Sequence, residues 1–324
     1  MFEQLKGKTV LVTGGAGFVG SHLARKLLEN GARVIVLDNL STGSESNIAD
    51  LRVHKNFVFI KGDANILADI EGVFAKHKVD FVFHYAAKVG VLRTIEHPLD
   101  VMKDIDGVRN VLEMSRQHGV KKVVFSSSSE VYGDPVEFPE REDGHLNPKM
   151  PYAVVKLVGE KYLELYNQIY GLKTCSLRFF NIYGPRQDSS AYGFVVGIFI
   201  KQALAGEPLS VFGDGTQTRD FVYIDDNINA SILALLSAET DGQVVNIGTG
   251  RPMTVLDLAE SIIREVGSQG PEVKFLPMRS GGEIRHRFPD VGKMRKLLHY
   301  QPKYTIEKGL RETINWYKQL RKDK

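Results

Sequence analysis

A tyrosine and a lysine stand four residues apart, at Tyr152 and Lys156, within a stretch that has helical hydrophobic spacing. Residues four apart share one face of a helix, so the lysine ammonium can approach the phenol. A tyrosine with an ordinary pKa of about 10 is a poor base at neutral pH, and a nearby cation lowers that pKa by favouring the phenolate. We therefore expect Tyr152 to exchange a proton with a substrate, although the same spacing also occurs on ordinary helix surfaces.

A run of four serines, Ser126 to Ser129, ends an apolar segment that has the composition of a buried strand. Hydroxyl side chains at the end of a strand can hold a sugar hydroxyl in line with an acid/base group and a redox cofactor. Serines also form ordinary turns, and the run by itself is equally compatible with that interpretation. It predicts a polar site only in combination with the other motifs.

Three glycines near the amino terminus, Gly14, Gly17 and Gly20, separate a β-branched apolar run from a helix-forming stretch. This pattern is typical of a strand, a tight turn and a helix whose N-terminus faces a pyrophosphate. Asp38 ends the next apolar run, about eighteen residues after Gly20, where a carboxylate can bind the two hydroxyls of an adenosine ribose. Because that carboxylate would repel a 2′-phosphate, the sequence predicts NAD as the cofactor.

The first half of the chain alternates between apolar strand-like runs and amphipathic helical stretches. The expected strands cover 9–13, 32–37, 56–60, 79–84, 121–127 and 173–178, and the expected helices cover 21–29, 66–78, 99–117 and 152–170. Strands separated by helices form right-handed βαβ crossovers, so we expect an α/β fold with a doubly wound, Rossmann-type parallel sheet. Ligands bind at the carboxyl ends of such strands, where the sequence has Asp38, Asp63, Ala86, Ala87, 126–129 and 178–181.

The alternation changes after Asn181, where Gly184-Pro185-Arg186 interrupts the chain. Strands are expected at 209–212, 219–224 and 244–247, and helices at 194–204, 227–236, 255–266 and 305–318. We interpret residues 1–178 as a dinucleotide-binding domain. Residues 179–324 form mainly a smaller α/β substrate lobe, interleaved with the last strands of the sheet.

The composition is that of an ordinary globular protein of 324 residues with a net charge of +3. This balance offers no basic footprint for nucleic acid, and the apolar spans are too short for a membrane helix. The single cysteine, Cys175, excludes an internal disulfide framework and lies in an apolar run typical of a core. We expect no metal site, no nucleic-acid or membrane partner, and a cytoplasmic location.

Taken together, these motifs resemble those of the extended short-chain dehydrogenase/reductase family. Within that family they are most similar to the nucleotide-sugar 4-epimerases of the UDP-galactose/UDP-glucose 4-epimerase kind. The resemblance extends from about Lys8 to Trp316. It rests on the segments 13–20, 38–39, Ser128 with 131–133, Tyr152 with Lys156, 181–186 and 219–222.

The resemblance implies a role for each matching position. NAD would be bound by Gly14, Gly17, Phe18, Val19, Asp38, Asn39, Asp63, Ala64, Ala86, Ala87, Tyr152, Lys156 and Phe179. The substrate diphosphate would be bound by Asn181, Arg219 and Arg279, the uracil by Phe212 and the uridine ribose by Glu283. Fixed cationic donors suit a diphosphate, and a flat base needs an aromatic neighbour.

The catalytic residues that the resemblance implies are Ser128, Tyr152 and Lys156. Tyr152 would take the proton of a sugar 4-hydroxyl oriented by Ser128, while hydride passes from C4 to NAD. Return of hydride to the other face of the transient 4-keto sugar would invert C4. The resemblance thus implies an NAD-dependent isomerase that epimerises UDP-glucose and UDP-galactose or their N-acetyl analogues.

Glu130, which is also expected to contact the substrate, is compatible with two other reactions. Epimerases usually lack an acid here, whereas UDP-glucuronate decarboxylases and sugar 4,6-dehydratases have one. However, Ser129 does not easily replace the aspartate of a dehydratase, and Phe194 stands where decarboxylases usually have an arginine. A non-catalytic NAD-binding regulator is disfavoured, because Tyr152 and Lys156 are both present.

Arg287 stands where the resembling epimerases form a wall of the hexose pocket. It belongs to the basic run 285–287 and is therefore either a solvated arginine or part of that wall. If it faces inward, it narrows the pocket against N-acetylhexosamines or pairs with an acidic sugar, because an unpaired buried guanidinium is costly. Asp104 replaces an asparagine that the family usually has near NAD, which puts that contact in doubt.

The resemblance also implies a homodimer formed through the helices expected at 99–117 and 152–170. Val154, Val158, Leu165 and Ile169 supply one apolar stripe on the second helix. The same stripe is equally able to face the core of its own chain. The sequence does not distinguish the two arrangements.

Overall fold

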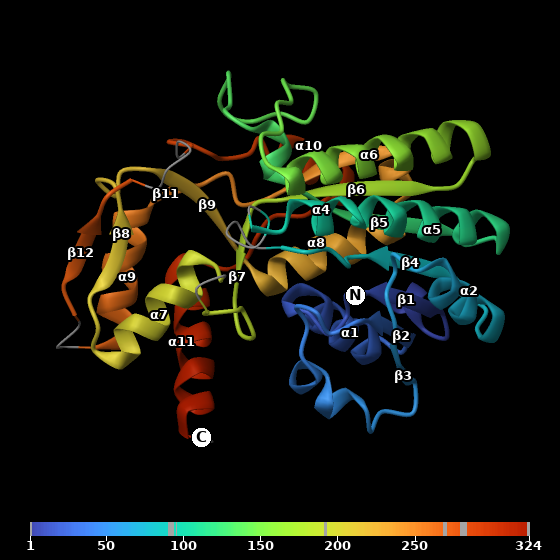
Figure 1. The fold of residues 1–324 in the computed structure, drawn as a ribbon, viewed down its shortest axis with the longest axis horizontal. Coiled ribbons are helices and arrows are strands. Elements are labelled where there is room, and N and C mark those ends of the chain that lie inside the picture. Colours follow the sequence, from blue (N-terminus) through green and yellow to red (C-terminus); the bar gives the residue numbers. More distant parts are fainter. Residues whose placement is uncertain are drawn as a thin grey trace.

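The computed structural model describes residues 2–89, 94, 96–190, 193–267, 271–278 and 284–322. A sheet of seven strands with flanking helices forms one side of the molecule, and a smaller group of strands and helices lies beside it (Figure 1). The larger part contains almost all of the first half of the chain. The α/β, Rossmann-type architecture expected from the sequence is confirmed.

The sheet has the strand order β10-β6-β5-β4-β1-β2-β3, and every neighbouring pair is parallel. Its strands are β1 (Thr9–Thr13), β2 (Arg33–Asp38), β3 (Phe57–Lys61), β4 (Phe81–His84), β5 (Lys122–Ser128), β6 (Thr174–Phe179) and β10 (Gln243–Ile247). After β3 the chain crosses back to the other side of β1. This reversal brings the carboxyl ends of β1 and β4 together, where such sheets bind ligands.

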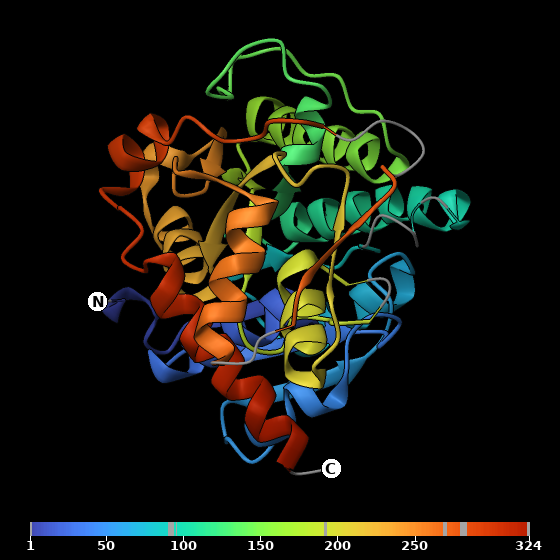
Figure 2. The same cartoon turned by 90° about the vertical axis from the view of Figure 1, so that its left-hand side faces the viewer.

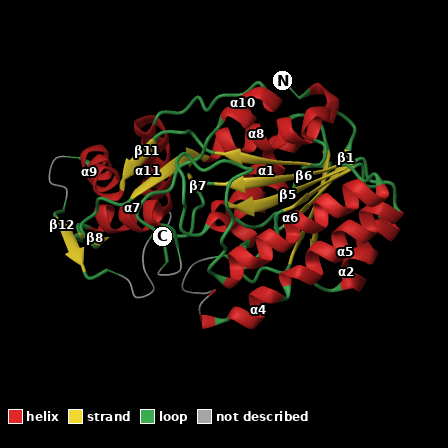
Figure 3. Cartoon of the chain, turned by 90° about the horizontal axis from the view of Figure 1, so that it is seen from above, coloured by secondary structure: helices red, strands yellow, loops and turns green. Residues whose placement is uncertain are grey.

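Helices cover both faces of the sheet, because its strands are apolar on both sides (Figure 3). Leu11 belongs to the core on one face, with α2 (Leu67–Lys76), α5 (Asp104–Gln117) and α6 (Pro151–Tyr170). Its neighbour Val12 belongs to the core on the other face, with α1 (Phe18–Glu29) and α8 (Ile224–Leu236). The short helix α4 (Pro98–Met102) packs beside α5 and α6.

Within the described residues, the smaller lobe contains two short sheets and three helices. Figure 2 views the molecule from the side of this lobe. One sheet joins β7 (Asn181–Tyr183), β9 (Thr218–Tyr223) and β11 (Pro252–Thr254), and the other pairs β8 (Leu209–Phe212) with β12 (Val273–Leu276). The helices are α7 (Val195–Ala205), α9 (Val255–Val266) and α11 (Ile306–Lys322), while α10 (Gly292–Leu298) packs against α8 and β10 of the main sheet. The division at residue 178 stays a prediction.

Candidate active site

The glycine turn joins β1 to α1 at the carboxyl edge of the sheet. Gly14 has φ +72°, a conformation that favours glycine, and a Cβ there would lie 2.7 Å from the amide nitrogen of Ala86. A Cβ on Gly20 would lie 2.2 Å from the carbonyl oxygen of Gly14, so no larger residue fits between turn and helix. Gly17 is the N-cap of α1 and provides no side-chain cap, which leaves the first N–H groups of the helix for an anion.

Asp38 ends β2 and faces the glycine turn. Its carboxylate accepts hydrogen bonds from the backbone amides of Ala16, at 2.9 Å, and Leu40, at 2.8 Å. Burial raises the pKa of this carboxyl, and the two amide bonds lower it. Asp38 stands at the position expected for a ribose ligand. Its two amide bonds also stabilise the loop that follows β2, a role that the sequence did not predict.

The other residues predicted to bind NAD follow the same edge of the sheet. They are Phe18 and Val19 in the first turn of α1, Asn39 after β2, Asp63 and Ala64 after β3, Ala86 and Ala87 after β4, and Phe179 at the end of β6. The side-chain amide of Asn39 donates to the Asp63 carboxylate at 2.9 Å, which ties the ends of β2 and β3 together. One continuous edge thus presents all of these positions.

Tyr152 and Lys156, on α6, lie against the serines that end β5. The Lys156 ammonium donates to the Ser126 hydroxyl at 3.3 Å and lies 5.5 Å from the centroid of the Tyr152 ring. The Ser128 hydroxyl interacts with Tyr152 and accepts a hydrogen bond from the Glu130 amide at 3.2 Å. The three residues predicted to be catalytic therefore form one cluster.

Burial dominates the proton affinities of this cluster. It raises the pKa of the Tyr152 phenol; the Ser128 hydrogen bond lowers that pKa, and the charges of Glu130 and Asp104 raise it further. Burial also lowers the pKa of the Lys156 ammonium to about 8, against the raising effect of nearby carboxylates, Asp104 first. We expected the Lys156 cation to lower the pKa of the Tyr152 phenol. In the protein without NAD this prediction is wrong, because burial and the charges of Glu130 and Asp104 raise that pKa instead.

Asp104 begins α5 and is buried. Its carboxylate accepts a hydrogen bond from the Lys88 amide at 2.8 Å and one from the Asn65 side chain at 3.1 Å. These bonds hold it between the loops that follow β4 and β3. Since its charge raises the pKa of Lys156, Asp104 lies within electrostatic reach of the predicted catalytic cluster.

Arg287 has only 2% of its side chain exposed, so the solvated interpretation is wrong. Its guanidinium forms an ion pair with Glu130 and donates to the carbonyl oxygen of Gly133 at 2.8 Å. On the other side, its Nε atom lies 3.8 Å from Oε1 of Glu140. Glu140 could not be predicted as a site residue from the sequence, because nothing distinguishes it from the other acidic residues of its loop and its partner is far away in the chain.

The residues predicted to bind the UDP group belong to the smaller lobe. Asn181 in β7, Arg219 in β9 and Phe212 at the end of β8 are all partly buried. The charge of Arg219 lowers the pKa of Glu140, which brings β9 within electrostatic reach of the Arg287 cluster. The other two predicted residues, Arg279 and Glu283, lie outside the described residues.

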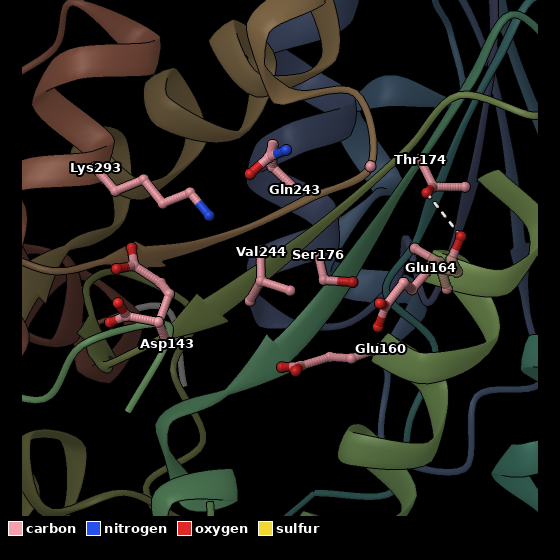
Figure 4. A pocket seen from close by; sticks show the side chains of 11 residues that line it. Asp143, Glu160, Glu164, Thr174, Ser176, Gln243, Val244 and Lys293 are labelled. Atoms are coloured by element: carbon pink, nitrogen blue, oxygen red, sulfur yellow. Dashed lines mark hydrogen bonds between the residues drawn. The ribbon is translucent and has the colours of Figure 1, made fainter. Parts of the chain in front are cut away.

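A cavity of about 220 Å³ lies elsewhere, between β6, β10 and α6 (Figure 4). The described residues that line it include Glu160 and Lys293 and none of the predicted site residues. The Glu160 carboxylate accepts two hydrogen bonds from Arg178 and one from Ser127. The cavity is therefore separate in its residues from the candidate active site, but Glu160 connects its wall to the serine strand.

A protein-family model described as the NAD dependent epimerase/dehydratase family matches residues 10–248, where the glycine turn, the serine strand and the Tyr152–Lys156 pair all lie. The chain belongs to this family. As a member of the epimerase/dehydratase family, the protein is an enzyme and NAD is its cofactor.

Relatives of this family member are similar along nearly their whole length. A UDP-glucose 4-epimerase of Mycolicibacterium smegmatis is 38% identical over 310 residues, which cover 95% of this chain and 98% of the relative. A UDP-N-acetyl-alpha-D-glucosaminuronate decarboxylase of Bacillus cytotoxicus is 35% identical over 327 residues, which cover 98% and 99%. Both an epimerase and a decarboxylase are thus similar to this chain.

Solved structures of epimerases have the same fold as this family member. That of UDP-glucose 4-epimerase from Thermotoga maritima, with UDP-glucose, matches with a TM-score of 0.90 and 39% identity, covering 96% of this chain and 99% of the other. The UDP-glucose 4-epimerase of Thermus thermophilus, in complex with NAD, matches with a TM-score of 0.87 and 36% identity over the same shares. These similarities agree with the fold and cofactor predicted from the sequence.

Proposed function

We propose that this epimerase/dehydratase family member inverts C4 of a UDP-hexose, either UDP-glucose and UDP-galactose or their N-acetyl analogues. The observation that carries the proposal is the cluster of Ser128, Tyr152 and Lys156 at the same sheet edge as the glycine turn. The likeness to UDP-glucose 4-epimerases along almost the whole chain supports this reaction.

The residues at the sheet edge fit NAD. The uncapped N-terminus of α1 suits a pyrophosphate, the lack of a side chain at Gly14 and Gly17 lets the backbone approach it, and Asp38 suits a ribose diol. Asn39, Asp63 and Ala64 would complete the adenosine side, and Phe179 the nicotinamide side. Bound NAD would supply a hydride acceptor for one half of the reaction and a hydride donor for the other.

The protein side chains would move one proton and hold the sugar in place. Tyr152 takes the proton of the sugar 4-hydroxyl and later returns it, and Ser128 orients that hydroxyl. Because the Lys156 pKa is about 8, its ammonium is charged at neutral pH and stabilises the phenolate when it forms. Asn181 and Arg219 would hold the diphosphate, together with Arg279, while Phe212 and Glu283 would bind the uridine.

The test is to incubate the purified protein separately with UDP-glucose, UDP-GlcNAc and UDP-glucuronate and to resolve the products by NMR. Appearance of the C4 epimer of one of the first two sugars supports the proposal. The second candidate is decarboxylation of an acidic UDP-sugar, which the similarity to the Bacillus cytotoxicus decarboxylase and the acid at Glu130 favour. Release of carbon dioxide, or loss of water, without epimerisation would contradict the proposed function.

We also propose that the enzyme is a homodimer formed through α5 and α6. Val154, Leu165 and Ile169 are 36%, 47% and 64% exposed, so this part of the stripe does not face the core of its own chain. Leu165→Lys is expected to produce a monomer in light scattering at micromolar concentration, because it puts a charge in the proposed interface. Val53→Lys, at a position 90% exposed on another surface, is the control, and a monomeric parent protein would contradict the proposal.

A further inference from the structure

Glu140 is a buried carboxyl that the mechanism above does not use. It lies in the loop between the short helix η4 (Ser129–Tyr132) and α6, and neither of its carboxyl oxygens has a hydrogen-bond partner among the described residues. Arg287 lies against it, and the Nε of that guanidinium also lacks a hydrogen-bond partner within the described part of the chain. A buried polar pair in this condition is costly, so its presence here requires an explanation.

The pair lies beside the residues that we place around the sugar. Glu130, the other partner of Arg287, donates its amide to the Ser128 hydroxyl, and its charge raises the pKa of Tyr152. The charge of Arg219, on β9, also acts on Glu140. The cluster of Glu130, Glu140 and Arg287 is thus within electrostatic reach of both the proposed acid/base and the proposed diphosphate ligand, so we place the hexose beside it.

The charges within this cluster do not favour a third carboxylate. Arg287 supplies one positive charge, and two glutamates face it, Glu130 from the partly exposed side and Glu140 from the buried side. One terminal nitrogen of the guanidinium is bonded to Glu130 and the other to the Gly133 carbonyl oxygen. These three side chains have a net charge of zero when Glu140 is protonated and of −1 when Glu140 is ionised, so Arg287 offers an acidic sugar no unneutralised positive charge in either state.

We propose that Glu140 is a specificity-determining positioning residue: it lies against Arg287, which Glu130 neutralises, and its ionisation makes this wall of the hexose pocket reject hexuronic acids in favour of neutral hexoses. The proposal rests on the proposed function, because it assumes that the hexose lies beside Ser128 and Tyr152. It assigns a substrate class to the site: UDP-sugars whose hexose carries no carboxylate.

The proposal implies a pH dependence that a merely structural role would not produce. Burial raises the pKa of Glu140 to about 8. Among the described residues, the charge of Arg287 lowers that pKa, that of Glu130 raises it and that of Arg219 lowers it, and the nearby Phe288 amide also lowers it. Above that pKa the wall becomes negative. Binding of UDP-glucuronate relative to UDP-glucose should therefore weaken about tenfold as the pH rises through this range.

The experiment measures the ratio of the inhibition constant of UDP-glucuronate to the KM of UDP-glucose, at about pH 6.5 and about pH 9. We expect the ratio to rise with pH for the parent enzyme and to stay constant for Glu140→Gln, whose side chain has the same shape but does not ionise. The double variant Glu130→Gln, Glu140→Gln leaves Arg287 without a carboxylate and should lower the ratio about tenfold or more at both pH values. Glu137→Gln, on the exposed part of the same loop, is the matched control and should behave as the parent.

The same rise with pH in Glu140→Gln would overturn the proposal, as would an unchanged ratio in the double variant. If the double variant does not fold, the comparison between the parent and Glu140→Gln decides alone. Absence of UDP-glucose epimerisation in the parent would refute the proposed function instead. In that case calorimetric binding of UDP-glucuronate and UDP-glucose to the same variants tests the charge selection directly.

Discussion

The ion pair between Arg178 on β6 and Glu160 on α6 determines how firmly the serine strand is supported. The two side chains are 2% and 3% exposed, and two hydrogen bonds of 2.9 and 2.8 Å join them. The guanidinium also donates to the Tyr132 hydroxyl, at 2.9 Å, and to a backbone carbonyl. Ser127 donates to the same carboxylate, so the pair links the sheet, α6 and η4 beside the site.

Arg178→Met is expected to lower the free energy of unfolding by about 3–5 kcal/mol, because it leaves the Glu160 carboxylate buried without its cation. Glu160→Met alone should cost a similar amount for the converse reason. The double variant should recover most of either loss, since two apolar side chains of comparable length then replace the pair. The measurement is a double-mutant cycle from urea unfolding, monitored by circular dichroism.

The matched control is the exposed pair Arg25–Asp50, whose side chains are 21% and 62% exposed. Its removal by Arg25→Met should cost less than about 1 kcal/mol, because solvent screens both charges. A loss of that small size for Arg178→Met, or losses that simply add in the double variant, would refute the reasoning about the buried pair.

Three further predictions concern the site itself. Tyr152→Phe should retain NAD and the fold but reduce kcat by several orders of magnitude, and Ser128→Ala should reduce kcat by about 10²–10⁴-fold. A near-normal kcat of the tyrosine variant would show that another group takes the proton. Asp104→Asn removes a negative charge that raises the pKa of Lys156, so the ammonium should lose its proton at a lower pH than in the parent. The alkaline limb of the pH–rate profile should therefore shift to lower pH, and an unshifted limb would contradict this prediction. Arg287→Ser should raise kcat/KM for UDP-GlcNAc relative to UDP-glucose, because it opens the wall of the pocket, and an unchanged ratio would mean that the guanidinium does not border the hexose.

The strands of the main sheet could be predicted because each is a local apolar run, and the Tyr152–Lys156 pair because four residues make one helical turn. The expected helix 99–117 is instead divided between α4 and α5 at Lys103. The strands β7, β11 and β12 and the helix α10 could not be predicted, since short elements depend on pairing and packing with distant parts of the chain. The contact between Glu140 and Arg287 could not be predicted for the same reason, because the two residues are far apart in the chain.

The position of β10 in the chain determines how long one edge of the sheet stays unpaired during synthesis. β6 is complete at Phe179, but its outer neighbour β10 follows only about 65 residues later. At a translation rate of about 5–20 residues per second, the outer edge of β6 is unpaired for several seconds while the intervening segment is made. The unpaired N–H and C=O groups of an open apolar strand can pair with another chain. β6, which contains Cys175, is such a strand during this interval. A fragment that ends at residue 178 would keep this edge open permanently, so we expect the first 178 residues, expressed alone, to aggregate.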